Sequence, residues 1–255
     1  MTYENALDFY SHLVSAEDWW EYMISSHFFS KEGTPYFLAP KHTWIDRRAR
    51  IGAKTIVFPG CVIMGKVVIG KNCVLMPGSV LINEEISEEE RANGKTEMRL
   101  GDNCLVYPNT TLLNVETGDG VTLGLPHQKN SKIGDGAVIG ALAELNRCIL
   151  GKNVKDQHHS YLGDTIVGDG TNIGAGTITA NYDGQKKHKT VFGPNCSTGV
   201  NTSIVAPNEF PEGTIIGAGS TIVANIRRLI TLEPYTILIC RAKEIVKKTA
   251  KRLTP

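Results

Sequence analysis

The sequence has almost no net charge and no long apolar segment. It balances 27 Lys and Arg against 26 Asp and Glu, so the formal net charge of the 255 residues is +1. A balance this close to neutral gives no general attraction to nucleic acid or to a membrane surface. No apolar run approaches the length of a bilayer span, and Met1 to Tyr10 lacks the apolar segment of a signal peptide. We therefore expect a cytoplasmic protein with neither nucleic acid nor membrane as a partner.

Cysteine is also scarce, and its placement argues against a disulfide scaffold. Four of the six cysteines, Cys61, Cys73, Cys104 and Cys196, fall at one phase of the repeat described next. That phase holds small or β-branched residues elsewhere, and a thiol fits there as a small apolar group. We expect reduced cysteines that serve packing.

An aliphatic residue recurs every six positions. The first run is Ile45, Ile51, Val57, Ile63, Ile69, Leu75 and Leu81. Four residues after each comes a small or β-branched residue: Ala49, Thr55, Cys61, Val67, Cys73 and Ser79. A period of six fits neither an α-helix nor a hairpin array. It predicts a three-sided prism in which each hexapeptide forms one short side, the aliphatic residue points inward, and glycine serves at tight corners.

The same phase resumes after an interruption. The later positions are Leu100, Val106, Leu112, Ile133, Ile139, Leu145, Leu150, Asp156, Leu162, Val167, Ile173, Thr179, Phe192, Thr198, Ile204, Phe210, Ile216 and Ile222. Steps of five after Leu145 and after Leu162 predict coils of 17 rather than 18 residues. The predicted fold class is an all-β solenoid, a parallel β-helix of hexapeptide repeats. Spacing alone does not give its hand, although parallel crossovers are normally right-handed.

Both ends depart from the repeat. Residues 3–29 lack it, and Leu7, Tyr10, Leu13 and Val14 have helical spacing. Ser15 is a candidate N-cap of a second helix. We predict two short helices that close the open end, because exposed coil edges invite pairing.

The C-terminal residues predict an extended piece followed by a basic helix. The predicted domains are a helical cap at 1–38, a solenoid at 39–226 and this C-terminal extension at 227–255. Two insertions interrupt the solenoid, an acidic, helix-prone surface excursion near 83–97 and a loop at 181–189. The loop combines an Asp-Gly turn with three lysines. We expect function there, because loops on rigid scaffolds commonly carry it.

Ordered motifs in the second half resemble a known family. They are HHSYLGD at 158–164, NIGAGTIT at 172–179, NYDG at 181–184, KHKT at 187–190 and IVAP at 204–207. Residues 144–223 resemble the acetyltransferase domain of the bifunctional N-acetylglucosamine-1-phosphate uridyltransferase/glucosamine-1-phosphate acetyltransferase; the earlier coils share only the repeat. The resemblance implies a left-handed solenoid, acetyl-CoA as acyl donor, an amino sugar as acceptor, no required metal, and an active site between subunits of a homotrimer.

The resemblance also assigns roles to single residues. It implies that His158 is the general base, that Glu144 orients it, and that the Ala175 N–H stabilises the oxyanion. The implied acceptor-binding residues are Tyr161, Asn172, Lys187 and Asn146, with Lys187 reaching the pocket of a neighbouring subunit. The implied acetyl-CoA contacts are Ala175, Asn181, Tyr182, Val200, Ala218 and Arg241, the last near a phosphate.

The sequence departs from the family at three of these places. Asn146 stands where the family has a lysine that holds the sugar phosphate, and the partner arginine falls near Gln128. Losing both cations removes bidentate phosphate binding, so we expect an acceptor other than simple glucosamine 1-phosphate. Lys129, Lys132 and Arg147 are candidate replacements. Val200 stands where the family has a serine that contacts the cofactor, which Val200 cannot fully replace.

We predict an acetyl-CoA-dependent N-acetyltransferase that acts on an amino sugar or a phosphorylated or nucleotide-linked derivative. One alternative is a non-catalytic trimeric solenoid that binds a sugar or a protein partner. Another is O-acetylation by the same base. A third is a metal enzyme like γ-type carbonic anhydrase, with His127, His158 and His159 as the only histidines in the right region. Against the third, neighbouring His158 and His159 cannot easily share one metal, and His159 is expected to be a surface or substrate-lining residue.

Overall fold

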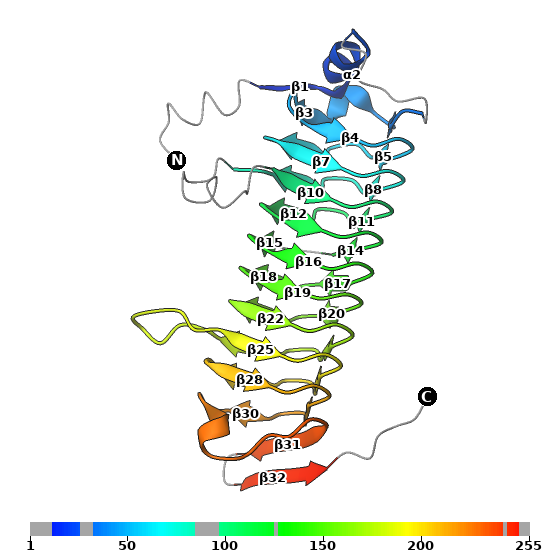
Figure 1. Ribbon diagram of the computed structural model, residues 1–255. Coiled ribbons are helices and arrows are strands. Elements are labelled where there is room, and N and C mark those ends of the chain that lie inside the picture. The colour runs from blue at the N-terminus through cyan, green and yellow to red at the C-terminus, as the bar shows by residue number, and fades with distance from the viewer. Residues whose placement is uncertain (1–11, 26–32, 85–96, 125–126, 242–243, 250–255) are drawn as a thin grey trace. The chain divides into compact units, whose positions relative to one another are not determined.

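The computed structural model describes residues 12–25, 33–84, 97–124, 127–241 and 244–249. They form two compact units, residues 1–129 and 130–255. Each unit is a stack of coils with three flat faces, called here A, B and C, which the chain visits in the order A, C, B (Figure 1). Within a face, each strand pairs in parallel with the strand one coil later, so each unit is a parallel β-solenoid.

The first unit begins with β1 (Leu13–Ser15), α2 (Ala16–Ser25) and the 3-10 helix η1 (Pro40–His42). Its face A contains β3 (Trp44–Asp46), β6 (Val62–Met64), β9 (Val80–Ile82), β12 (Thr111–Leu113) and β15 (His127–Lys129). Its face B contains β2 (Tyr36–Phe37), β5 (Ile56–Val57), β8 (Val74–Leu75), β11 (Leu105–Val106) and β14 (Thr122–Leu123). Its face C contains β4 (Arg50–Ile51), β7 (Val67–Ile69), β10 (Met98–Leu100) and β13 (Glu116–Thr117).

The second unit repeats this plan. Its face A contains β18 (Glu144–Asn146), β21 (Tyr161–Gly163), β24 (Ile178–Ala180), β27 (Ser203–Val205) and β30 (Thr221–Ile222). Its face B contains β17 (Val138–Ala141), β20 (Lys155–His158), β23 (Asn172–Ile173), β26 (Ser197–Thr198), β29 (Ile215–Ile216), β31 (Thr236–Arg241) and β32 (Glu244–Thr249). Its face C contains β16 (Lys132–Ile133), β19 (Ile149–Leu150), β22 (Thr165–Val167), β25 (Thr190–Phe192) and β28 (Asn208–Phe210), and η2 (Ile226–Arg228) follows β30.

The six-residue period produces the core as predicted. Every position of the aliphatic phase is buried, from Ile45 to Ile222, and stacks on its counterpart one coil away. The rings of Phe192 and Phe210 stack with centroids 5.1 Å apart. The core therefore extends along the axis of each unit. Burying each Leu, Ile or Val of this column stabilises the fold by on the order of 1.5–3 kcal/mol. All six cysteines are buried and free, which agrees with the packing role predicted for Cys61, Cys73, Cys104 and Cys196.

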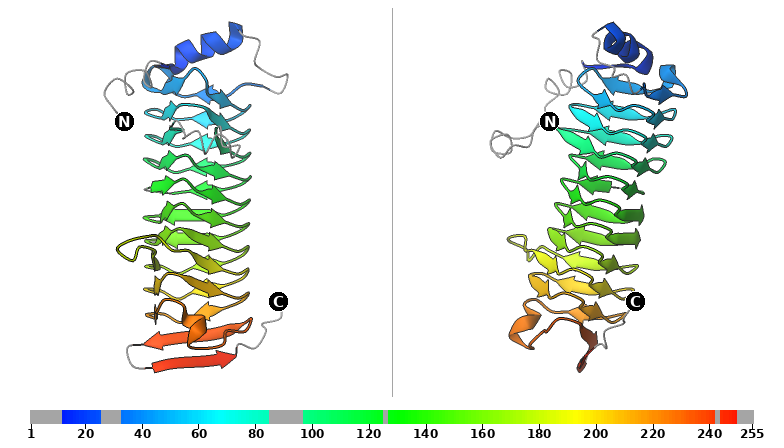
Figure 2. Two further views of the ribbon diagram at one scale, coloured as in Figure 1. Left: turned by 60° about the vertical axis from the view of Figure 1, so that its left-hand side comes forward. Right: turned by 45° about the vertical axis from the view of Figure 1, so that its right-hand side comes forward.

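The predicted coil lengths are also confirmed. In the first unit Val62 pairs with Val80, a step of 18 residues. In the second unit Val138 pairs with Lys155, a step of 17. The step from Thr165 to Thr190 is 25 residues, because the loop at 181–189 is inserted between β24 and β25 and projects from the coil (Figures 1 and 2). The other predicted insertion lies largely outside the described residues.

The N-terminal prediction is partly wrong. Ser15 does cap a helix: its Oγ accepts the Asp18 backbone N–H at 3.1 Å, and α2 starts at Ala16. Leu13 and Val14, however, form strand β1, which pairs antiparallel with β3. The first coil offers an unpaired strand edge, and edge pairing outweighs weak helical spacing. The rest of the first predicted helix, before residue 12, lies outside the described residues.

The predicted C-terminal basic helix is wrong. Residues 236–241 form β31, which pairs in parallel with β29, and β32 folds back antiparallel on β31. Thr236, Leu238 and Cys240 are buried while Ile237 and Ile239 are half-buried, an alternation with the strand period of two. The last coil exposes backbone donors and acceptors, and β31 satisfies them.

Candidate active site

Four residues with predicted roles lie in one column where face B turns into face A. His158, Ala175, Val200 and Ala218 occupy the same place in successive coils, below Ala141, as the register of β17, β20, β23, β26 and β29 shows. We call this column the His158 corner. Backbone bonds link its members: His159 N to Ala141 O, Gly176 N to His158 O, Asn201 N to Ala175 O, and Gly219 N to Val200 O.

The turn that forms the His158 corner explains its exposure. The residue after each column member has positive φ, namely Leu142, His159, Gly176, Asn201 and Gly219. The left-handed residue turns the chain from face B into face A and leaves the preceding side chain on the outside of the corner. His158 and Val200 are accordingly exposed. His159, with φ of 46°, forms the turn itself, which distinguishes the two neighbouring imidazoles.

Glu144 and Tyr161 lie beside the His158 corner on face A. They are partners in the register of β18 and β21, and both are half-buried. Burial and then the Glu144 carboxylate raise the pKa of the Tyr161 phenol. Between the described side chains of Glu144 and His158 no hydrogen bond is formed in this chain. The structure therefore places Glu144 beside the His158 corner, and its role in orienting His158 stays a prediction.

Asn172 approaches the same corner from face B. It is exposed and pairs with Lys155 and Ser197 of the neighbouring coils. Because Ala175 follows it by three residues, Asn172 and Tyr161 lie on the two faces that meet at the His158 corner. A ligand at this corner can contact both faces.

A second group of predicted residues lies at the other end of face A, where it turns into face C. In the second unit this turn contains Arg147, Asp164, the loop 181–189, Pro207 and Asn225, and we call it the loop corner. Its coils are linked by Asp164 N to Asn146 O, Ala206 N to Ala180 O, Asn208 N to Lys189 O, and Asn225 N to Pro207 O.

A polar network fixes the root of the loop. Arg147 donates from Nε to Asp164 Oδ1 at 2.6 Å and from Nη2 to Asp164 Oδ2 at 2.9 Å. Asp164 also accepts a hydrogen bond from the amide of buried Asn181. The Arg147 hydrogen bonds lower the pKa of Asp164, against the opposing effect of burial and with a further contribution from the Asn181 contact. Asp164 ends the motif at 158–164, but the motif predicted no role for it; only three-dimensional stacking joins these residues.

The same network defines the surroundings of Asn146. Arg147 Nη1 donates to Asn146 Oδ1 at 2.6 Å, so the Asn146 amide nitrogen is the end left for other partners. The Arg147 charge is already bound by Asp164, with the guanidinium about one-third exposed. Among the proposed replacements for the missing phosphate cations, Arg147 is therefore engaged elsewhere.

The loop itself is internally ordered. Asp183 Oδ1 accepts the backbone N–H groups of Gln185 and Lys186, each at 2.8 Å, and Oδ2 lies 2.6 Å from His188 Nε2. These contacts lower the pKa of Asp183. The Tyr182 hydroxyl donates to Gly184 O at 2.6 Å, and Tyr182 forms a bridge with Lys187. Exposed Tyr182 and Lys187 are thus presented on a shaped loop.

The predicted acetyl-CoA residues divide between the two corners. Ala175, Val200 and Ala218 belong to the His158 corner, while Asn181 and Tyr182 belong to the loop corner. Arg241 ends β31; its neighbour Cys240 donates its N–H to Ser220 Oγ, which places this strand end near the His158 corner. Nothing is described of the Arg241 side chain.

A buried carboxyl lies inside the solenoid behind the His158 corner. Asp156 is fully buried at an aliphatic-phase position, and its Oδ1 accepts the Ser160 hydroxyl at 2.5 Å. Its Oδ2 has no partner among the described residues. Burial, against the Ser160 hydrogen bond, raises the Asp156 pKa to about 6. The repeat predicted the inward position of Asp156 but not the raised pKa of its carboxyl.

Among the described residues, no three side chains of His, Cys, Asp or Glu gather as a metal site requires. The three-histidine alternative stays a prediction, because the His127 side chain is outside the described residues. In the part of the chain that the structure describes, every helix is too short or too polar to span a membrane.

Known proteins share the hexapeptide repeat and much of the sequence of this chain. Residues 48–83 match the family "Bacterial transferase hexapeptide (six repeats)". The chain is 36% identical over 209 residues to the bifunctional protein GlmU of Clostridium novyi (strain NT), covering 81% of this chain and 41% of that protein. It is 35% identical over 211 residues to GlmU of Geobacillus sp. (strain WCH70), covering 82% and 41%. The chain thus spans about two fifths of the length of these curated relatives, and the predicted resemblance is confirmed.

A solved structure matches the fold. It is an Arabidopsis UDP-N-acetylglucosamine acyltransferase, with a TM-score of 0.50, 15% sequence identity, and coverage of 80% of this chain and 72% of that chain. With the repeat match, this confirms the predicted class, a left-handed parallel β-helix of hexapeptide repeats. At this identity the match concerns fold alone.

Proposed function

We propose that this hexapeptide-repeat relative of the GlmU proteins is an acyltransferase that moves an acetyl group from acetyl-CoA to the nitrogen of an amino sugar. The observation that carries the proposal is the His158 corner, where one exposed imidazole is stacked directly above Ala175, Val200 and Ala218. His158 is the expected general base, and Ala175, Val200 and Ala218 are the expected contacts to the acyl donor. The homology to GlmU supports the same activity.

The proposed reaction is a direct transfer in a ternary complex. His158 accepts a proton from the acceptor amine as its nitrogen forms a bond to the thioester carbon. The tetrahedral oxyanion that results receives the Ala175 N–H, which has no acceptor among the described residues. The carbon–sulfur bond then breaks, and protonated His158 returns the proton to the CoA thiolate. Holding both substrates together supplies much of the acceleration, and no metal is needed.

The acceptor site lies at the turn between faces B and A and extends along β18 from Glu144 to Asn146 at the loop corner. Tyr161, Asn172 and Asn146 supply neutral hydrogen-bonding groups, and Glu144 lies beside Tyr161. On β18 the Asn146 amide replaces a lysine of the resembled family, and Arg147 is bound by Asp164. These features support an acceptor that is not simply glucosamine 1-phosphate.

The assembly we propose is a homotrimer in the cytoplasm. Predicted donor residues occupy both ends of face A, and a groove between two solenoids lets one acetyl-CoA contact the His158 corner of one subunit and the loop corner of the next. Lys187 on the projecting loop then reaches the acceptor pocket of a neighbour. A monomer by light scattering would contradict this arrangement.

The test measures CoA release from acetyl-CoA with a panel of amino sugars: free, 1-phosphorylated and nucleotide-linked. We expect release with one class, and a loss of about 10²- to 10⁴-fold in His158→Ala, the range typical of a general base. The matched variant His159→Asn keeps a residue that tolerates positive φ and is expected to retain activity within several-fold.

Three outcomes would change the proposal. Product analysis that found an ester rather than an amide would indicate O-acetylation. A clear preference for glucosamine 1-phosphate would refute the acceptor hypothesis. If no acceptor in the panel gave any CoA release with a folded oligomer, the sugar-binding or scaffold alternative would be favoured.

A further inference from the structure

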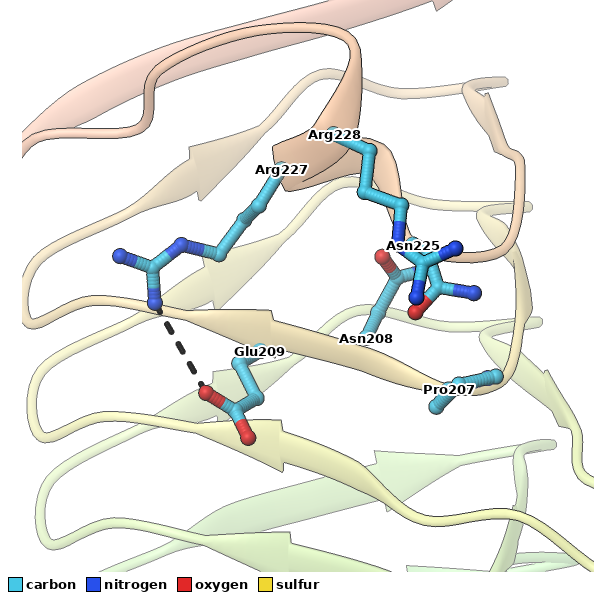
Figure 3. Close-up of a pocket in the computed structure, with 6 residues that line it drawn as sticks. All are labelled: Pro207, Asn208, Glu209, Asn225, Arg227 and Arg228. Carbon is cyan, nitrogen blue, oxygen red and sulfur yellow. Dashed lines mark ion pairs between the residues drawn. The ribbon is translucent and has the colours of Figure 1, made fainter.

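A cavity of about 300 Å³ lies on the loop corner, away from His158. Its lining residues are Pro207, Asn208, Glu209, Asn225, Arg227 and Arg228 (Figure 3). They come from β28 and the residue before it, and from the turn and 3-10 helix after β30, so the whole cavity belongs to the second unit.

The floor of this cavity is held rigidly. Asn208 Nδ2 donates to Val205 O at 2.8 Å and to Val223 O at 2.9 Å, and its Oδ1 accepts the Ile226 N–H at 2.9 Å. Asn208 is buried and all its amide groups are used within the chain, so it shapes the cavity and is not available to a ligand. Arg227 and Arg228 belong to η2, whose first residue, Ile226, is anchored by this amide.

The two arginines of the cavity differ. Arg227 Nη1 lies 3.7 Å from Glu209 Oε2, and both side chains are more than half exposed, so this pair is weak. No ion pair holds Arg228 among the described residues, and its side chain lies on the side of the cavity where Asn225 is drawn, away from Glu209 (Figure 3). With two guanidinium groups and one carboxylate, the cavity has an excess of one positive charge.

The cavity also continues the line of the loop. At the two ends of the loop, the Ala206 N–H donates to Ala180 O and the Asn208 N–H donates to Lys189 O. One coil further, the Asn225 N–H donates to Pro207 O. Coils are spaced about 4.8 Å apart, so Arg228 lies roughly 10 Å along the solenoid from the loop root. An extended pantetheine arm can cover that separation.

We propose that this cavity binds a phosphate group at the nucleotide end of the acyl donor, with Arg228 as the principal cation. A guanidinium matches phosphate geometry with paired N–H donors, and Arg228 has no competing carboxylate. The inference rests on the proposed function, because it takes Tyr182 and Asn181 as contacts to the same donor. It adds a phosphate subsite two coils from the loop, in addition to the one expected at Arg241.

The test compares two donors that share the thioester and the pantetheine arm. Acetyl-CoA carries the phosphates and S-acetylpantetheine lacks them. We expect Arg228→Ala to raise KM for acetyl-CoA about tenfold, with kcat within twofold and KM for S-acetylpantetheine unchanged. Arg227→Ala, whose guanidinium faces Glu209, is the matched control and is expected to have a smaller effect. Equal effects on both donors, or none, would overturn the proposal.

A binding measurement separates this inference from the proposed function. The dissociation constant of CoA is measured by titration calorimetry for the wild type and for Arg228→Ala at low and at higher salt. Weaker and less salt-dependent binding by the variant supports the subsite. Equal binding refutes it while leaving the CoA-dependent function intact, and absence of CoA binding to a folded wild type would refute both. Arg228 is exposed, so its substitution should leave folding unchanged.

Discussion

Replacing Asp156 with asparagine should change the free energy of unfolding, relative to the wild type, more favourably near neutral pH than near about pH 4.5. Asp156 is fully buried in the second unit, with one oxygen bonded to Ser160 and the other unpartnered. Burial, opposed by the Ser160 bond, raises its pKa from 3.8 to about 6. The substitution keeps the shape of the side chain and removes the titration.

The magnitude follows from proton linkage. Between about pH 4 and pH 6 the unfolded chain releases the Asp156 proton while the folded chain keeps it, so the free energy of unfolding falls as pH rises. Above the folded pKa the loss is complete, and a shift of roughly two units corresponds to about 3 kcal/mol. The amide of the variant carries a fixed cost from its own unpartnered group. Its advantage over the wild type should nevertheless grow by about 2 kcal/mol between about pH 4.5 and about pH 7.5.

The assay is urea denaturation of both proteins at one fixed protein concentration across that pH range. Because the fixed cost of the amide is the same at every pH, the change in the difference between the two proteins reports the Asp156 titration. Ser160→Ala, which removes the one bond that favours the charged form, should shift the transition to higher pH. A difference that does not depend on pH would refute the reasoning.

Two further predictions concern local order. Asp164→Asn weakens the contacts with Arg147 and Asn181, so trypsin should cleave after the loop lysines several-fold faster. Asp102→Asn in the first unit is the control, and an unchanged cleavage rate in Asp164→Asn would contradict the prediction. Ser15→Ala removes the cap of α2 and should lower the free energy of unfolding of the first unit by about 1 kcal/mol. Thermal denaturation measures this change with Ser203→Ala as the control. Equal midpoints for the two variants would contradict the capping role.

The recurrence of one aliphatic residue in six was enough to predict the coils, the core and their change in length. These features depend on local spacing: a residue such as Ile63 is buried because the chain turns at regular intervals, whichever coil lies next to it. The family motifs likewise placed His158, Ala175 and Val200 among candidate site residues, and these roles stay predictions that the proposed experiments test.

The ends were predicted less well for a physical reason. Helical spacing at Leu13 and a basic composition after Tyr235 are weak local preferences. At the ends of a solenoid they compete with an open strand edge, whose backbone groups need partners. Strand β1 and the hairpin of β31 and β32 satisfy that edge.

By itself, the sequence determined which residues face inward and how long each coil is, because both follow from a period that the chain repeats. The tertiary structure alone decided which outward residues meet. Arg147, Asp164 and Asn181 join in one network, and Arg228 lies along the same corner, because parallel coils stack in register across insertions. Such contacts depend on the stacking of distant coils, and a local repeat carries no information about the side chains that stacking brings together.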